Sequence, residues 1–279
     1  MKIVRNQTFT GERALFQAND LQIVNSVFED GESPLKHSRN LILTDCAFRW
    51  KYPLWYSRDI RLRNVSFLDT ARAGIWYTEQ LHAESCEIAA PKAFRRCADL
   101  RFSGVSFPNA AETLWNCRNV ELRDVSVTGD YFGMNCRDVA ADGLEINGNY
   151  CFDGAKNLEI RNARLISKDA FWNCENVTVS DSFISGEYFG WNSNHMTLIN
   201  CTVESLQGFC FIQNLTLKNC TLPNTTLAFE YSTVDAEISG SIDSVKNPLS
   251  GVIRARSIGE LILDPSQIDP QNIRVICEE

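Results

Sequence analysis

A spacing of about 19 residues runs through most of this chain and limits what it can fold into. Apolar anchor residues recur at gaps of 19 to 21, and the last six gaps are all 19. Two residues after each anchor stands a second apolar or small residue, which is the alternation of a β-strand. A fixed period of this length is typical of a protein that adds one turn per repeat. The anchors are Leu21, Leu41, Ile60, Leu81, Leu100, Val120, Val139, Leu158, Val177, Met196, Leu215 and Val234.

The other positions of the repeat predict sharp corners between short strands. An Asn or Asp usually precedes the anchor, as Asn40 and Asp59 do, and these residues tolerate a left-handed backbone. A compact side chain such as Cys46 follows the anchor by five residues, and a large apolar one such as Phe48 by seven. The unit lacks a period of 3.6 residues and the L-x-x-L-x-L spacing, which argues against a leucine-rich repeat.

The repeat also resembles a known family. Its unit, L-x-L-x-[ND]-[small]-x-[FVI] with the corner Asn, covers residues from about 15 to 240 and resembles the right-handed parallel β-helix of the pectate-lyase-like superfamily. More narrowly, it is similar to a bacterial family of uncharacterised β-helix proteins. The twelve anchors predict about twelve turns, and the resemblance implies an all-β, single-domain solenoid. A four-sided pentapeptide-repeat helix stays open as an alternative because "DCAF", "NCTV" and "NCTL" are similar to its repeats.

The two ends of the chain depart from the regular repeat. We expect residues 1–18 to form an N-terminal cap or an irregular first turn, and residues 19–240 to form the regular turns. The segment 241–279 contains three prolines and a blurred period, so we expect irregular turns and a cap there. Caps are expected because a stacked sheet exposes unpaired strand edges at each end.

Composition excludes several classes of function. Acidic residues outnumber basic ones, 35 to 27, and no long Lys/Arg run occurs, which argues against a nucleic-acid partner. No run of 18 apolar residues and no signal-peptide pattern is present, so we expect no membrane association and a cytoplasmic protein. Eleven cysteines without a CxxC pair, beside three histidines, argue against a zinc site. We expect no metal and no cofactor.

The segment "LWNCRN" (114–119) recurs as "FWNCEN" (171–176), and comparing the two with other turns indicates the role of the cysteines. The position two residues before the corner accepts Cys, Ser, Thr or Ala. Metal binding or redox chemistry would not explain this interchange, whereas a narrow corner that faces inward does. The Asn one residue earlier predicts a ladder of hydrogen-bonded amides between turns.

Five of the six tryptophans share the position four residues before the corner. Lys36, Arg95 and Asp153 occupy the same position in other turns, and such charges are not buried unpaired. We therefore predict an outward stripe that suits the apolar faces of pyranose rings, or a protein partner. The indoles could instead stack on one another and stabilise the coil. The predicted substrate-binding residues are Trp55, Trp76, Arg95, Trp115, Trp172 and Trp191.

Candidates for catalysis are few. "DYFG" (130–133) recurs as "EYFG" (187–190), which places Asp130 and Glu187 at equivalent positions about 14 Å apart, too far for a glycosidase pair. Asp153 lies within the tryptophan position and lacks an acidic partner one turn away. The motifs of polygalacturonases and pectate lyases, which the resemblance would supply, are absent. If the protein is an enzyme, it is a carbohydrate-active hydrolase or lyase with Asp153, Asp130 or Glu187 as candidate residues.

Two hypotheses follow from the stripe. In the first, the protein recognises or modifies an oligosaccharide through the tryptophans. In the second, it is a non-catalytic scaffold whose stripe contacts another protein or a second copy of the chain. A fold resemblance alone says little about chemistry, so the sequence leaves both hypotheses open.

Overall fold

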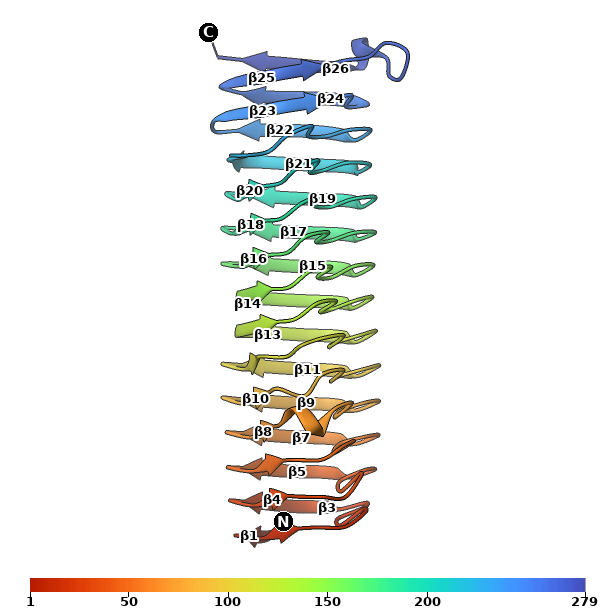
Figure 1. The fold of residues 1–279 in the computed structure, drawn as a ribbon, viewed down its shortest axis with the longest axis vertical. Coiled ribbons are helices and arrows are strands. Elements are labelled where there is room, and N and C mark those ends of the chain that lie inside the picture. The colour runs from red at the N-terminus through yellow and green to blue at the C-terminus, as the bar shows by residue number, and fades with distance from the viewer. Residues whose placement is uncertain (279) are drawn as a thin grey trace. The chain divides into compact units, whose positions relative to one another are not determined.

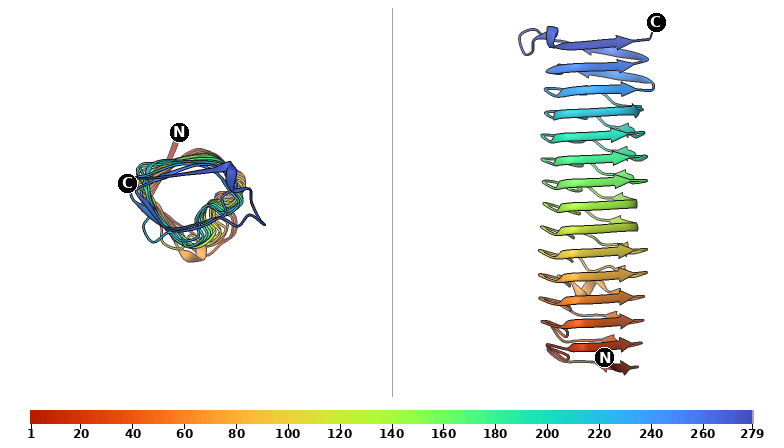
Figure 2. Two further views of the ribbon diagram at one scale, coloured as in Figure 1. Left: turned by 90° about the horizontal axis from the view of Figure 1, so that it is seen from above. Right: turned by 180° about the vertical axis from the view of Figure 1, so that it is seen from behind.

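The computed structural model describes residues 1–278, which are divided between two compact units, Met1–Glu145 and Ile146–Glu279. Both units are all-β parallel solenoids, as the repeat predicts (Figure 1). The chain makes about 15 turns, slightly more than the twelve predicted from the anchors. Seen from above, the backbone of the turns closes around an interior (Figure 2).

Unit 1 is built from a ladder of longer strands and a ladder of short ones. The longer strands pair in the order β1, β3, β5, β7, β9, β11 and β13, and the short ones in the order β2, β4, β6, β8, β10 and β12. The elements are β1 (Lys2–Arg5), β2 (Thr8–Phe9), β3 (Asn19–Val24), β4 (Val27–Phe28), β5 (Arg39–Thr44), β6 (Ala47–Phe48), β7 (Arg58–Arg63), β8 (Ser66–Phe67), η1 (Asp69–Ala71), β9 (Glu79–Glu84), β10 (Glu87–Ile88), β11 (Ala98–Ser103), β12 (Ser106–Phe107) and β13 (Arg118–Thr128).

Unit 2 repeats this plan, and β14 (Arg137–Asn147) spans the boundary in the sequence. Its longer strands pair in the order β15, β17, β19, β21, β22, β24 and β26. The elements are β15 (Lys156–Arg161), β16 (Arg164–Ile166), β17 (Glu175–Ser180), β18 (Phe183–Ser185), β19 (Asn194–Ile199), β20 (Thr202–Glu204), β21 (Gln213–Cys220), β22 (Thr233–Ile238), β23 (Ser241–Lys246), β24 (Ser250–Ala255), β25 (Ser257–Ile262), η2 (Pro270–Asn272) and β26 (Ile273–Cys277).

The apolar anchors set the register of these strands. In unit 1, Leu41 pairs with Ile60, and Ile60 pairs with Leu81. In unit 2, Val177 pairs with Met196 in the same way. Each anchor is buried, and the residue after it faces solvent or is half-buried, because successive side chains of a strand point to opposite faces. The 19-residue spacing therefore keeps every apolar position inside.

The core of each unit is a set of stacked columns. In unit 1 the rings of Phe28, Phe48 and Phe67 lie 4.5 Å and 4.7 Å apart in succession, and all three are buried. The corners take a left-handed backbone at the Asn and Asp before the anchors, as predicted; φ is 47° at Asn40 and 54° at Asp59. Amide ladders join successive corners, and Asn192 Nδ2 donates to Asn173 Oδ1 at 2.8 Å.

The two ends differ from the regular repeat in ways that explain the extra turns. Residues 1–18 form a turn whose strands β1 and β2 pair with β3 and β4. That turn escapes the anchor pattern because Lys2 stands where an apolar anchor is expected, opposite Leu21. At the other end the register steps change to 17 residues between Thr233 and Ser250, and to 22 between Gly251 and Ile273, so the period blurs although pairing continues.

Candidate functional site

Five side chains of unit 1 form an outward stack that we call the tryptophan column: Lys36, Trp55, Trp76, Arg95 and Trp115. The rings of Trp55 and Trp76 lie face to face, with centroids 4.9 Å apart and an angle of 6° between the planes. The guanidinium carbon of Arg95 lies 5.3 Å from the Trp76 centroid and 4.4 Å from the Trp115 centroid. Lys36 Nζ lies 5.6 Å from the Trp55 centroid. Rings and cations thus follow one another without a break.

The indole N–H groups of this column are already satisfied within the protein. Trp76 Nε1 donates to the carbonyl oxygen of Lys92 at 2.8 Å, and Trp115 Nε1 to that of Tyr131 at 2.7 Å. The indoles are half-buried on the outer side of the coil, with their faces covered by neighbours of the same stack. They offer edges rather than flat platforms to a ligand, and ligand binding by the column stays a prediction.

A second stack, the tyrosine column, lies one residue further along each turn: Phe16, His37, Tyr56, Tyr77 and Arg96. The rings of His37 and Tyr56 are 5.1 Å apart, and those of Tyr56 and Tyr77 are 4.7 Å apart with an angle of 5°. Arg96 lies 5.9 Å from the Tyr77 ring. Tyr56 is 44% exposed. Neither tyrosine hydroxyl has a hydrogen-bond partner among residues 1–278.

Sequence reasoning missed the tyrosine column for a geometric reason. Strand alternation would place the residue after each tryptophan on the opposite face. The backbone is instead left-handed at this position, with φ of 60° at His37, 55° at Tyr56 and 56° at Tyr77, so two successive side chains both face outward. The signal in the sequence is the aromatic pair itself, "WY" at 55–56 and again at 76–77.

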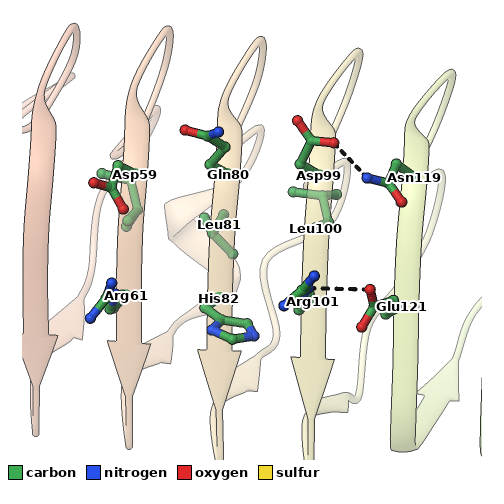
Figure 3. Close-up of a pocket in the computed structure, with 11 residues that line it drawn as sticks. Asp59, Arg61, Gln80, Leu81, His82, Asp99, Leu100, Arg101, Asn119 and Glu121 are labelled. Atoms are coloured by element: carbon green, nitrogen blue, oxygen red, sulfur yellow. Dashed lines mark hydrogen bonds and ion pairs between the residues drawn. The ribbon is translucent and has the colours of Figure 1, made fainter.

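A polar groove of about 420 Å³ begins three residues beyond the tyrosine column, on the outer face of β7, β9, β11 and β13 (Figure 3). Side chains project into it from each strand in turn. Its lining residues are Asp59, Ile60, Arg61, Gln80, Leu81, His82, Asp99, Leu100, Arg101, Asn119 and Glu121.

The two halves of this groove differ in how their charges are satisfied. On β11 and β13, Arg101 Nε pairs with Glu121 Oε1 at 3.2 Å, and Asn119 Nδ2 donates to Asp99 Oδ1 at 2.6 Å. On β7 and β9, the side chains of Asp59, Arg61 and His82 have no hydrogen-bond or ion-pair partner in the part of the chain that the structure describes. This half can bond a ligand without breaking internal contacts.

Unit 2 carries its own, looser aromatic stack. The rings of Trp172 and Trp191 are 6.0 Å apart at 32°, and Trp191 lies 4.8 Å from Phe211 at 45°. Trp172 Nε1 donates to the carbonyl oxygen of Tyr188 at 2.8 Å. Trp172 and Trp191 are half-buried like their counterparts in unit 1. Their predicted ligand contacts stay a prediction as well.

Two of the three candidate catalytic carboxyls, Asp153 and Glu187, have ordinary structural partners, and for Asp130 the contact is made by its backbone carbonyl. In unit 2, Asp153 Oδ1 accepts a hydrogen bond from Asn173 Nδ2 at 2.9 Å. Glu187 Oε2 lies 3.3 Å from Lys168 Nζ. Asp130 belongs to unit 1, where its carbonyl oxygen accepts from the Glu112 N–H. Nothing in these contacts tests a catalytic role, which stays a prediction.

The sequence did not single out Asp169 of unit 2, a carboxyl that is buried in the structure. It is 2% exposed, and its Oδ1 has no hydrogen-bond partner within residues 1–278. Burial raises the pKa of this carboxyl above the usual 3.8, partly opposed by Lys168 and the Tyr150 hydroxyl. A search for acidic pairs overlooks it because its unusual feature is burial, which a single sequence position does not reveal.

The cysteines are structural, as the interchange with Ser and Thr predicts. Cys97, Cys117 and Cys136 are buried in the inward corner, and Cys97 Sγ donates to the Ile75 carbonyl oxygen at 3.3 Å. None of the cysteines in the described chain forms a disulfide. Burial raises the pKa of the Cys151 thiol to about 12, which keeps this group protonated at neutral pH.

Comparison with known proteins adds a family. Residues 2–276 match the profile of a family described as "Protein of unknown function (DUF3737)". The chain belongs to this family. Both the uncharacterised family and the parallel β-helix predicted from the repeat are thereby confirmed. No curated protein matches the chain.

The chain is also similar to solved structures, at low sequence identity and with TM-scores below 0.5. PfbA, a surface adhesin of Streptococcus pneumoniae, is 8% identical, with a TM-score of 0.41 over 94% of this chain and 81% of its own. The tailspike protein of E. coli bacteriophage HK620, a mutant in complex with a pentasaccharide, is 13% identical, with a TM-score of 0.45 over 96% and 65%. The A-module of the Azotobacter vinelandii mannuronan C-5 epimerase AlgE4 is 12% identical, with a TM-score of 0.33 over 98% and 87%. Such similarity concerns the fold alone.

One further finding concerns membranes. Among the described residues, the structure contains no helix of the length and apolar character that crossing a bilayer requires.

Proposed function

We propose that unit 1 recognises an oligosaccharide that lies across β7 and β9, between the tyrosine column and the groove. The observation that carries this proposal is the set of unpaired polar groups there: Asp59, Arg61 and His82 in the groove, and the hydroxyls of Tyr56 and Tyr77 beside it. A sugar chain presents hydroxyls that both donate and accept hydrogen bonds. This face offers hydrogen-bond donors and hydrogen-bond acceptors to such hydroxyls.

The rigidity of the face also favours a ligand with a regular repeat. The groups project from strands whose neighbours lie about 4.8 Å apart, so they form rows at fixed intervals. Arg58 Nε donates to Gln80 Oε1 at 3.0 Å, which fixes the border between tyrosine column and groove. A ligand that binds a preformed row loses less entropy than one that must order flexible loops.

Within this proposal the tryptophan column has a supporting part. Its stacked rings hold the corner on which Tyr56 and Tyr77 stand; the centroids of Trp55 and Tyr56 are 6.4 Å apart. The exposed indole edges of Trp55, Trp76 and Trp115, with Arg95 between them, extend the surface that a longer ligand would touch. The proposal is one of recognition and includes no chemical step.

Isothermal titration calorimetry with a panel of neutral and acidic oligosaccharides tests the proposal. We expect at least one member to bind, and the double substitution Arg61→Ala/His82→Ala to weaken it about ten-fold or more, since a hydrogen bond to a charged group contributes about 1.5 to 3 kcal/mol. Arg256→Ala is the control, because this exposed arginine of unit 2 lies outside the groove and makes no side-chain contact within residues 1–278. Equal affinity of the two variants would refute the site.

The second hypothesis, a protein partner or a second copy of the chain, has its own readout. Tyr56 and Phe16 are exposed at 44% and 37%, and aromatic side chains with arginine are common interface anchors. Sedimentation velocity over a range of concentrations would reveal a dimer. A dimer that Tyr56→Ala abolishes, without any bound saccharide, would favour this function over the first.

A further inference from the structure

Asp169 interrupts an aromatic column on the outer corner of unit 2. Tyr150, Asp169 and Tyr188 occupy equivalent positions in three successive turns, and all have a left-handed backbone, with φ of 60°, 55° and 56°. The Asp169 N–H donates to the Glu187 carbonyl oxygen at 2.9 Å, and the Tyr150 N–H donates to the Lys168 carbonyl oxygen at the same distance. A carboxyl thus stands where the neighbouring turns carry a phenol ring.

The Tyr150 side chain of the preceding turn contacts this carboxyl. Tyr150 leans edge-on toward Trp172, with centroids 6.5 Å apart and an angle of 88°, and its hydroxyl bonds the Asp169 carboxyl. Asp169 is consequently 2% exposed, although it lies at the surface of the coil. Its Oδ1 has no hydrogen-bond partner in the described chain. A buried oxygen without a donor is costly and calls for one from outside the protein.

The charges around Asp169 favour a cation. Glu187 is a second carboxylate near Asp169, and Lys168 interacts electrostatically with both. Lys168 Nζ is already engaged, 3.3 Å from Glu187 Oε2 and 5.6 Å from the Tyr188 ring centroid. Two carboxylates against one ammonium leave a net negative charge beside three aromatic rings. Ring faces attract organic cations, and a carboxylate beside them strengthens the attraction.

We propose that Asp169, Tyr150, Trp172 and Tyr188 form a binding site for a primary ammonium group carried by a small organic molecule. The ammonium group donates a hydrogen bond to Asp169 Oδ1, and the rings surround it. The Tyr150 ring, which is half-buried, rotates away from Trp172 to admit the ligand. A metal ion fits less well, because no group of three or more His, Cys, Asp or Glu side chains among residues 1–278 is placed to hold one.

This inference goes beyond the proposed function, because it concerns another unit and another ligand chemistry. Either can fail alone. A neutral oligosaccharide that depends on Arg61 tests the groove, and an amine that depends on Asp169 tests this site.

Calorimetric titration with glucosamine, ethylamine and glucose provides the test. We expect glucosamine or ethylamine to bind and glucose not to bind, and Asp169→Asn to weaken the amine about ten-fold or more. Binding of both amines would show that the ammonium group suffices, whereas binding of glucosamine alone would indicate an amino sugar. Asp181→Asn is the matched control, since this exposed carboxyl of unit 2 only accepts a hydrogen bond from Asn200 at 3.0 Å.

Two measurements keep the test decisive. Circular dichroism should show that Asp169→Asn folds, because the substitution removes a buried charge and keeps the shape. Tyr150→Ala should weaken amine binding as well, since it removes one of the rings that surround the ammonium group. The proposal is overturned if neither amine binds the folded wild-type chain, or if Asp169→Asn binds the amine as well as Asp181→Asn does.

Discussion

Replacing Trp76 by alanine tests whether the tryptophan column holds the corner of unit 1 together. Trp76 stacks on Trp55 at 4.9 Å, faces the Arg95 guanidinium at 5.3 Å and donates from Nε1 to the Lys92 carbonyl oxygen at 2.8 Å. Aromatic stacking contributes about 0.5 to 1.5 kcal/mol, an exposed cation–π contact about 0.5 to 1 kcal/mol and a hydrogen bond about 1 kcal/mol. We therefore expect Trp76→Ala to lower the free energy of unfolding by about 3 kcal/mol.

Trp50 supplies the matched control. It is half-buried, as Trp76 is, but its one ring contact in the described structure is with Lys51 Nζ at 5.1 Å. Its replacement by alanine should lower the free energy of unfolding by about 1 kcal/mol. Urea denaturation followed by circular dichroism measures both values from the transition midpoint and slope.

A double-mutant cycle separates stacking from the other terms. Trp55→Ala, Trp76→Ala and the double variant should show a coupling of about 1 kcal/mol, which only direct contact between the rings explains. Equal costs for Trp76→Ala and Trp50→Ala, with no coupling, would refute the structural reading. The indole faces would then be accessible, and the tryptophan column would again be a candidate sugar-binding surface.

Three further outcomes follow from individual positions. Gly251→Ala should lower the free energy of unfolding by about 2 kcal/mol or more in the same urea assay, because φ is +118° and the added Cβ would lie 1.8 Å from the Val234 carbonyl oxygen. Gly240→Ala is the control and should be nearly neutral, since a Cβ there would have no heavy atom within 4 Å. Asp169→Asn should raise the free energy of unfolding at pH 7, because the pKa of the Asp169 carboxyl is higher in the folded state than in the unfolded state, so the wild-type protein loses stability as pH rises through the folded pKa. The stabilisation by Asn should vanish below pH 3.8, where the carboxyl is protonated in both states, and a stabilisation that grows on acidification would contradict the raised pKa. Cys151→Ala should reduce the loss of stability above pH 9.0, since a thiol with a folded pKa of about 12 lowers the free energy of unfolding by about 2 kcal/mol near pH 10.5. The thermal midpoint measured against pH checks this, and an unchanged slope would show that burial does not raise the pKa of this thiol.

The inward half of each repeat could be predicted from the sequence because stacking constrains it at every turn. Leu54, Ile75 and Leu114 are buried at the position before the tryptophan column, and Cys117 fills the narrow corner as expected. An apolar side chain that slipped by one residue would face water, so the pattern admits one register. Residues 1–18, expected to form a cap or an irregular first turn, lack the anchor signal because a lysine stands at the anchor position.

The outward half could be predicted only in part. Alternation alone would turn Tyr77 to the side opposite Trp76, whereas the left-handed backbone at Tyr77 leaves both side chains half-exposed. Whether two outward rings cover each other's faces depends on rotamers that a sequence does not reveal. The groove beside Arg61 and His82 likewise depends on which charges pair across strands, and on this face only some of them do.

In a stacked repeat, each column holds similar side chains in successive turns. A position is informative where a different kind of side chain stands in the column and the rest of the protein does not pair its charge. Arg95 interrupts the tryptophan column, and its Nε has no hydrogen-bond partner among residues 1–278, yet two rings cover its faces and Glu112 Oε2 lies 2.5 Å from its Nη2, so its charge is paired within the protein. Asp169 interrupts a tyrosine column in the same way, but Lys168 pairs with Glu187 instead, and one carboxyl oxygen is left without a donor. An ion pair offsets the charge at the first position, and among residues 1–278 no ion pair does so at the second. A buried carboxyl whose charge has no ion-pair partner in the described chain is the stronger candidate for a role in binding.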